Sequence, residues 1–155
     1  MKILRNKPKC YVLIGLPGSG KSTWCKNNYP NLPIVSRDII RSELGYTKDP
    51  DKKRVLSRAQ EEIITNKENE LIKQLAREKK DFIIDDTNIK REYRLRLIKL
   101  LRELGVYIVA VYFKTPLNVC IQRRSDQIDP EIMKRLGKAI TKPEPQEYDK
   151  LIEVK

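Results

Sequence analysis

The sequence predicts an α/β fold, a three-layer sandwich in which helices cover both faces of a central parallel sheet. Short apolar segments rich in β-branched residues alternate with segments of helical periodicity, a pattern typical of βαβ units. A glycine-rich turn joins the first apolar segment to the first helical one. Because 155 residues suffice for one compact core and are too few for two ordinary enzymatic modules, we expect a single domain spanning residues 1–155.

Five apolar segments are the predicted strands. Most are short and are bounded by charged, glycine or proline residues, as strand ends usually are. They are residues 10–14, 33–36, 81–84, 106–113 and 151–154. Ligands of a parallel sheet bind at the carboxyl ends of its strands, so the residues that directly follow these segments are the first candidates for a functional site.

Helices are predicted between these strands. The first begins at Lys21, and a short one over 38–44 stops at Gly45. Asp49 as a cap and Pro50 as the first helical residue open a long helix. Its inward face is predicted from the helical spacing of five apolar residues, Val55, Ala59, Ile63, Leu71 and Leu75.

The helix predicted over 88–104 has one apolar and one basic face. The apolar face is formed by Tyr93, Leu97, Leu100, Leu101 and Leu104. The basic face is formed by Arg91, Arg94, Lys99 and Arg102. We expect the basic face to point into solvent and, together with the basic N-terminus, to hold a nucleic-acid backbone.

Charge and residue usage narrow the functional classes. The formal net charge of +12, from 33 basic and 21 acidic residues, favours polyanionic partners such as nucleic acid, although a solvated basic surface without a ligand is the alternative. The chain has no histidine, so any general base must be a carboxylate or a lysine.

Cysteine usage and the N-terminus indicate the compartment. Cys10, Cys25 and Cys120 are odd in number and far apart, which indicates neither a disulfide framework nor a zinc site and fits a reducing cytosol. The basic N-terminal residues precede an apolar run too short for a signal peptide or a membrane span. We therefore expect a cytoplasmic protein with no membrane partner.

Residues 15–22, GLPGSGKS, match the phosphate-binding pattern GxxxxGK[ST] between a predicted strand and a predicted helix. Glycines let backbone N–H groups converge on phosphate oxygens, and the helix start adds positive potential. Lys21 is expected to reach the β and γ phosphates of ATP, and the Ser22 hydroxyl is expected to bind Mg²⁺. The predicted nucleotide-binding residues of this segment are Gly15, Pro17, Gly18, Ser19, Gly20, Lys21, Ser22 and Thr23.

A second motif, SRDIIR at residues 36–41, follows the second predicted strand. Asp38 and Arg41 lie three residues apart, on one face of a helix start. A carboxylate there can accept the proton of an attacking hydroxyl, and an arginine can hold an acceptor phosphate with paired donors. The alternative for Asp38 is an ordinary helix cap.

Three motifs together resemble the kinase domain of the phage-type 5′-hydroxyl polynucleotide kinases. They are GLPGSGKSTW at 15–24, SRDIIR at 36–41 and DDTN at 85–88, in the family's order and spacing, and the resemblance covers nearly the whole chain. It implies a P-loop kinase fold with a helical lid at about 116–140. It also implies Asp38 as general base, Arg41 on the acceptor's 3′-phosphate, and Lys21 and Ser22 on the ATP phosphates and metal.

The family's DTN aspartate corresponds to Asp86, which is essential to the family's site. A carboxylate at the carboxyl end of a strand can face the glycine-rich loop and organise Mg²⁺, its waters or Ser22. If the strand geometry continues, side-chain alternation places Asp85 on the opposite face. We therefore predict Asp86, with Ser22, as the metal-binding pair.

The predicted lid carries Arg123 and Arg124. A cation that closes over the transferred phosphoryl group stabilises its charge, and closure excludes water. We predict Arg123 as a catalytic residue and both arginines as nucleotide-binding. The resembled family has two lid arginines four residues apart, and Gln127 stands at the second position. Arg124, Lys134 or Arg135 is then the candidate for that role, unless the phosphate clamp is weaker; the alternative is a merely solvated helix.

The expected reaction is the transfer of the ATP γ phosphate to the 5′-hydroxyl end of DNA or RNA, as in nucleic-acid end healing. A kinase for a small-molecule or tRNA-linked hydroxyl, and a non-catalytic nucleotide-dependent nucleic-acid binder or motor, are the alternatives. No phosphatase signature of the DxDxT type is present, so 3′-phosphatase activity is not expected from this chain, and a separate phosphatase or ligase is a candidate partner. A stand-alone module of this kind suits a virus, with the host cytoplasm as its location.

Overall fold

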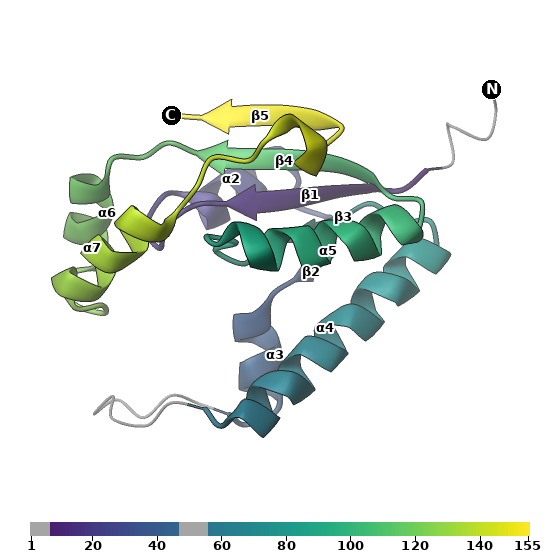
Figure 1. The fold of residues 1–155 in the computed structure, drawn as a ribbon, viewed down its shortest axis with the longest axis horizontal. Helices are drawn as coiled ribbons and strands as arrows, with labels where there is room; N and C mark the ends of the chain where they lie inside the picture. Colours follow the sequence, from purple (N-terminus) through teal and green to yellow (C-terminus); the bar gives the residue numbers. More distant parts are fainter. Residues whose placement is uncertain (1–6, 47–55) are drawn as a thin grey trace.

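A computed structural model describes residues 7–46 and 56–155. Its five strands form one parallel sheet of order β2-β3-β1-β4-β5. The strands are β1 (Lys9–Ile14), β2 (Ile34–Val35), β3 (Phe82–Ile84), β4 (Tyr107–Phe113) and β5 (Lys150–Val154). The predicted α/β fold with a central parallel sheet is therefore confirmed (Figure 1).

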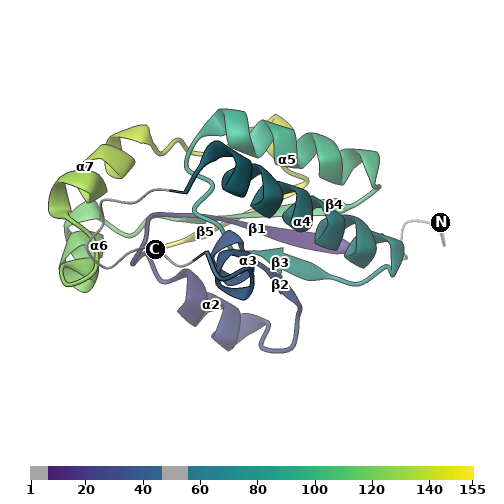
Figure 2. The same cartoon turned by 90° about the horizontal axis from the view of Figure 1, so that it is seen from below.

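Helices cover both faces of this sheet. They are α2 (Lys21–Asn28), α3 (Arg37–Glu43), α4 (Arg58–Arg77), α5 (Arg91–Glu103), α6 (Leu117–Arg124) and α7 (Pro130–Ala139), with a short 3-10 helix η1 (Pro145–Glu147) before β5. Figure 2 shows α4 and α5 running along one face of the sheet. Helices α6 and α7 lie beyond the ends to which the strand arrows point (Figure 1).

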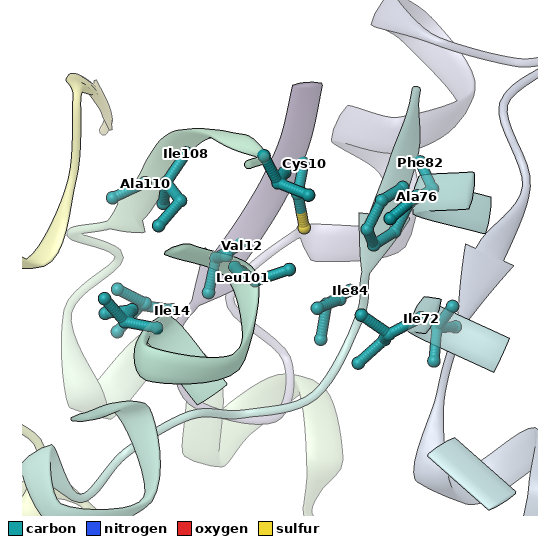
Figure 3. Close-up of a cluster of buried hydrophobic side chains, with 13 residues drawn as sticks. Cys10, Val12, Ile14, Ile72, Ala76, Phe82, Ile84, Leu101, Ile108 and Ala110 are labelled. Carbon is teal, nitrogen blue, oxygen red and sulfur yellow. The ribbon is translucent and has the colours of Figure 1, made fainter. Parts of the chain in front are cut away.

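The alternation of β1 separates the two sides of the core. Cys10, Val12 and Ile14 point to the side where Ile72 of α4 and Leu101 of α5 are buried, as the close-up in Figure 3 shows. The residues between them, Tyr11 and Leu13, pack with α2 on the other face. Both faces of β1 are apolar because the central strand of a parallel sheet is covered on both sides.

The inward face of α4 differs from the predicted one by one residue. The buried residues are Ile64, Glu68, Ile72 and Ala76. Ile63 and Leu71, predicted to be inside, are 42% and 39% exposed. The helix begins at Arg58 after the Ser57 cap, and the predicted start at Asp49 and Pro50, with Val55, lies outside the described residues.

The predicted faces of α5 also need correction. Arg94, expected in solvent, is fully buried, and Tyr93, expected in the core, is 58% exposed. Arg94 Nε donates to Glu147 Oε1 at 2.7 Å, and its Nη1 donates to the carbonyl oxygens of Asn88 and Ile89 at 3.0 and 2.9 Å. These bonds compensate the buried charge and tie α5 and η1 to the segment that follows β3.

The other basic residues of that face are partly neutralised as well. Arg91 pairs with Glu144 at 2.8 Å, and Arg102 pairs with Asp149 at 3.0 Å. The basic face of α5 therefore has much less free positive charge than its sequence indicates.

Within residues 7–46 and 56–155, the structure contains no helix with the length and apolar character needed to span a membrane.

Candidate active site

The glycine-rich segment forms the turn between β1 and α2, at the carboxyl end of the central strand. Gly18 and Gly20 have φ angles of 82° and 100°, in the region that side-chain-bearing residues rarely adopt. Gly20 is the N-cap residue of α2, and no side chain bonds the N–H groups of the first turn. These N–H groups therefore stay available to an anion. The predicted phosphate cradle is thus present as a backbone structure.

Lys21 lies folded over this turn. Its Nζ donates to the carbonyl oxygens of Gly15 and Leu16 at 2.9 and 3.0 Å. Burial lowers the pKa of Lys21, while the nearby Asp85 carboxylate acts in the opposite direction. The ammonium group is held at the mouth of the turn, and phosphate oxygens can replace the two carbonyl oxygens as its partners.

Two cavities meet at this lysine. One, the α3 cavity, has a volume of 630 Å³ and lies between the turn, α3, α5 and the segment after β3. The other, the α6 cavity, has a volume of 740 Å³ and lies between α2, α6 and the residues after β4. Lys21, Ser22 and Arg124 line both cavities, so the phosphate cradle stands between two separate binding spaces.

The predicted nucleotide-binding residues divide between these spaces. Gly18, Ser19, Gly20 and Thr23 line the α6 cavity, and Pro17 lines the α3 cavity. Gly15 lines neither; its N–H donates to the carbonyl oxygen of Thr87 at 3.1 Å. A Cβ atom at Gly15 would lie 2.6 Å from Ser19 Oγ and 2.9 Å from Phe113 Cβ, so this glycine is required by close packing.

Asp38 and Arg41 line the α3 cavity together with Lys21 and Ser22. Their side chains form an ion pair across one turn of α3. Asp38 is 87% exposed and Arg41 only 15% exposed. The helix cap is Ser36, whose hydroxyl accepts from the Ile39 N–H, so the capping role considered for Asp38 is filled by another residue. The negative charge of Asp38 acts on Lys21 by raising its pKa against the lowering effect of burial.

Both aspartates after β3 line the α3 cavity. The prediction that Asp85 points away was wrong: its carboxylate interacts electrostatically with Lys21. Burial raises the pKa of Asp85, and Lys21 acts against this rise. Strand β3 ends at Ile84, so strand alternation no longer applies to these two residues.

Asp86 is held by α3 and faces a buried glutamate. Its Oδ1 accepts from the backbone N–H of Arg37 at 2.9 Å. Burial and the Asp86 carboxylate raise the pKa of Glu68 to about 9. Arg37 also pairs with Glu61 at 2.8 Å and lies 3.8 Å from Glu68. Sequence reasoning missed Glu68, because a glutamate within a charged helix gave no signal of burial.

The residues present fit a Mg²⁺ ion that arrives with a nucleotide. Among the described residues, no group of three or more acidic, cysteine or histidine side chains forms a metal cage. Mg²⁺ usually binds through one or two carboxylates, waters and substrate phosphates, and needs no such cage. Ser22, Asp85 and Asp86 share the α3 cavity beside the cradle and supply oxygen ligands of the kind that this ion prefers.

The lid arginines take different positions. Arg123 Nη1 donates to the Gly18 carbonyl oxygen at 3.0 Å and lines only the α6 cavity. Arg124 lines both cavities, and its Nη1 donates to Gln127 Oε1 at 2.7 Å. Gln127, which stands where the resembled family has its second arginine, thus accepts a hydrogen bond from Arg124. Neither Lys134 nor Arg135 lines the two cavities.

Asn88 fixes the loop that presents the aspartates. It has a φ angle of 51°, and its Nδ2 donates to the carbonyl oxygens of Leu13 and Asp86 at 2.8 and 3.3 Å. The DDTN segment is therefore bonded to the end of β1 and, through Thr87, to Gly15. Its asparagine positions the aspartates and the glycine-rich turn relative to each other.

This arrangement is the P-loop kinase fold: a parallel sheet, a glycine-rich turn after the central strand, and carboxylates at the ends of neighbouring strands. A family model described as "AAA domain", AAA_33, matches residues 11–136. The chain belongs to this family.

Several known proteins are similar to the chain. An L-seryl-tRNA(Sec) kinase of Methanococcus maripaludis is 31% identical over 143 residues, covering 85% of this chain and 52% of that protein. A chain of the Pnkp1/Rnl/Hen1 RNA repair complex has a TM-score of 0.74 at 23% identity over 86% of this chain and 44% of that one. A chain in a second Pnkp1/Rnl/Hen1 structure has a TM-score of 0.65 at 28% identity over 76% and 39%.

The APS kinase CysC of Mycobacterium tuberculosis is similar in fold, with a TM-score of 0.64 at 19% identity over 95% of this chain and 88% of that one. The chain spans about half the length of the seryl-tRNA kinase and less than half of the chains from the repair complexes. The fold is thus shared by kinases with different acceptors, and the acceptor must be inferred from the site.

Proposed function

We propose that the protein transfers the γ phosphate of ATP to the 5′-hydroxyl end of a nucleic acid. The observation that carries the proposal is the shared α3 cavity, in which Asp38 and Arg41 lie with Lys21 and Ser22. A proton acceptor and a phosphate-binding cation thus face the same space as the phosphate cradle. The 28% identity to a chain of a Pnkp1/Rnl/Hen1 complex, which the other similar structure describes as an RNA repair complex, supports a nucleic-acid acceptor.

Each cavity has its own role in this proposal. The α6 cavity receives the nucleoside part of ATP, and the cradle and Lys21 hold its phosphates. The acceptor hydroxyl enters the α3 cavity from the opposite side, which suits in-line attack. The bond from the hydroxyl oxygen to the γ phosphorus forms, the bond from that phosphorus to the ADP oxygen breaks, and the Asp38 carboxylate takes the hydroxyl proton.

The cations around the transferred group stabilise its charge. Lys21 and Arg124 line both cavities, so both can contact a phosphoryl group that passes from one cavity to the other. Mg²⁺, held by Ser22 and by Asp86 or Asp85, supplies further charge neutralisation when bound. Arg41 holds the phosphate next to the accepting hydroxyl with its planar donor set.

A second candidate acceptor is the hydroxyl of an amino acid carried on tRNA. It is favoured by the 31% identity to an L-seryl-tRNA(Sec) kinase. The same carboxylate and the same cradle would serve this reaction, because both acceptors are primary alcohols. Arg41 would then bind a phosphate of the tRNA.

The test is a transfer assay with labelled ATP and Mg²⁺. The acceptors are a 5′-OH RNA, a 5′-OH DNA, the matching 5′-phosphorylated strands and a seryl-tRNA. We expect label on the 5′-OH strands and none on the 5′-phosphorylated ones. Label on seryl-tRNA alone would replace the first candidate by the second, and ATP hydrolysis without a labelled acceptor would overturn both.

Variants of α3 test the role of Asp38. We expect Asp38→Asn to lower kcat by roughly 10²- to 10⁴-fold, the usual contribution of a general base, while the Kd for ATP changes little. Glu43→Gln is the matched control, because Glu43 lies exposed on the same helix and lines neither cavity. Equal activity of Asp38→Asn and Glu43→Gln would remove Asp38 from the reaction.

Two further features stay predictions. Since the proposed product is a 5′-phosphorylated end, a separate phosphatase or ligase is the kind of partner that would act on the same strand. Co-purification with such an enzyme on broken RNA would test this. The cytoplasmic location likewise remains a prediction of the sequence.

A further inference from the structure

A second depression, which we call the α4–α5 groove, lies between α4 and α5 beside the α3 cavity. The groove has a volume of 630 Å³. Arg37, Glu68, Tyr93 and Leu97 line both the groove and the α3 cavity. These shared residues place the groove directly beside the α3 cavity, so a strand whose end lies in the α3 cavity would pass over them to reach the groove.

We infer that this groove binds the nucleotides next to the accepting end of a single-stranded nucleic acid, with Tyr93 as a stacking platform for a base. The inference rests on the proposed kinase function and extends it to the substrate class. It accounts for an aromatic side chain that is exposed where the helical pattern of α5 predicted a core position.

Tyr93 has the surroundings of a base-stacking residue. It is 58% exposed and lies where the cavity and the groove meet. Lys90 Nζ lies over its ring at 5.9 Å from the centroid, and Arg96 Cζ lies over it at 6.0 Å. A base that stacks on this ring takes the place of one of these cations, which can then contact a flanking phosphate, an arrangement used by proteins that bind single strands.

The charge of the groove suits a polyanion. Its glutamates lie near Arg37, with Glu61 at 2.8 Å and Glu68 at 3.8 Å. Lys73 and Arg96 also line the groove, and neither has an ion-pair partner in residues 7–46 and 56–155. By contrast, Arg91 and Arg102 of α5 are paired with acidic residues, so the free positive charge near the site lies on the groove side.

The direct test is binding of a fluorescent 5′-OH hexanucleotide, measured by anisotropy. We expect Tyr93→Ala to raise the Kd roughly 5- to 100-fold, the range for the loss of one stacked base, and Tyr93→Phe to retain wild-type affinity. Leu95→Ala is the matched control, because Leu95 is 45% exposed on the same helix and lines neither the cavity nor the groove.

Salt dependence separates phosphate contacts from packing effects. Arg96→Ala and Lys73→Ala are each expected to reduce the slope of log Kd against log salt by about one. Lys67→Ala, exposed on α4 and outside the groove, should leave the slope unchanged. Wild-type slopes in both groove variants would overturn the inference, and so would an unchanged Kd in Tyr93→Ala.

Kinetics connect the groove to the reaction and keep the two proposals distinguishable. For a 5′-OH hexanucleotide, Tyr93→Ala should raise KM with little change in kcat. For a nucleoside 3′-phosphate, which does not reach past the α3 cavity, KM should be that of the wild type. An equal rise in KM for both acceptors in Tyr93→Ala would overturn the proposal that the groove binds the strand. If the wild type phosphorylates no 5′-OH end, the proposed function fails, and the binding measurements still decide whether the groove holds nucleic acid.

Discussion

The α6 cavity and the α3 cavity meet at Lys21, yet they are built in different ways. Much of the α6 cavity comes from one continuous segment, residues 18–24. The walls of the α3 cavity come from α3, α4, α5 and the segment after β3, which are held together by contacts such as Arg37 with Glu61 and Arg94 with Glu147. Local sequence therefore specifies much of the α6 cavity, whereas contacts between distant segments specify the α3 cavity.

The largest effect is expected from breaking the anchor of the α3 cavity. Arg94→Leu leaves Glu147, which is 1% exposed, as a buried charge without its main partner. We expect the free energy of unfolding to fall by about 3 to 5 kcal/mol, measured by urea denaturation. In the folded variant, the KM for the acceptor should change more than the Kd for ATP, because Arg94 holds the segment that carries the aspartates.

Two companion variants show whether burial causes this loss. Arg102→Ala removes an exposed ion pair with Asp149 and should cost about 1 kcal/mol or less. The double variant Arg94→Leu with Glu147→Leu should recover part of the lost stability, since no unpaired charge remains inside. An Arg94→Leu protein as stable as Arg102→Ala would contradict the role assigned to the buried pair.

The parts of the molecule that local sequence specifies are those that were predicted correctly. The apolar segments became the five strands, and GLPGSGKS became the turn between β1 and α2. A glycine turn that needs positive φ at two positions can be recognised from a few neighbouring residues, because backbone sterics are local. The same holds for Asp38 and Arg41, whose spacing on a helix start placed them side by side.

The inward faces of the helices were less predictable because buried charges interrupt the apolar pattern. On α4, Glu68 stands in the buried series with Ile64 and Ile72, so the neighbouring series with Ile63 and Leu71 appeared the better one. Glu68 can be buried because it lies beside Arg37 and Asp86. Those neighbours are distant in sequence, and a helical pattern contains no information about them.

Arg94 is likewise a buried charge within the apolar series of a helix, here α5. It is spaced four and seven residues before Ile98 and Leu101, both of which are buried. This spacing was the available signal that Arg94 points inward. The spacing could not identify the acidic partner of Arg94, because Glu147 lies 53 residues further along the chain. A buried arginine becomes a reasonable prediction only when its acidic partner is known.

A smaller effect should distinguish the two lid arginines. Arg124 lines both cavities and Arg123 only the α6 cavity. We therefore expect Arg124→Ala to lower kcat by roughly 10- to 100-fold, somewhat less than the loss of a dedicated charge-stabilising group. Arg123→Ala should mainly raise the KM for ATP. Steady-state kinetics with both substrates varied will separate the two, and interchanged effects would show that Arg123, as the sequence predicted, is the catalytic arginine instead of Arg124.

The last prediction concerns the pH dependence of stability and a buried carboxyl of the α3 cavity. An unfolded glutamate loses its proton near pH 4.5, whereas burial and Asp86 raise the folded pKa of Glu68 to about 9. Between these values the folded state holds more protons, so rising pH lowers the stability, by up to about 1.4 kcal/mol per pH unit. Glu68→Gln should remove this slope in urea unfolding of the metal-free protein between pH 5.5 and about 8.5. The exposed neighbour variant Glu70→Gln should retain the slope, and identical slopes in Glu68→Gln and the wild type would show that Glu68 ionises normally beside Asp86.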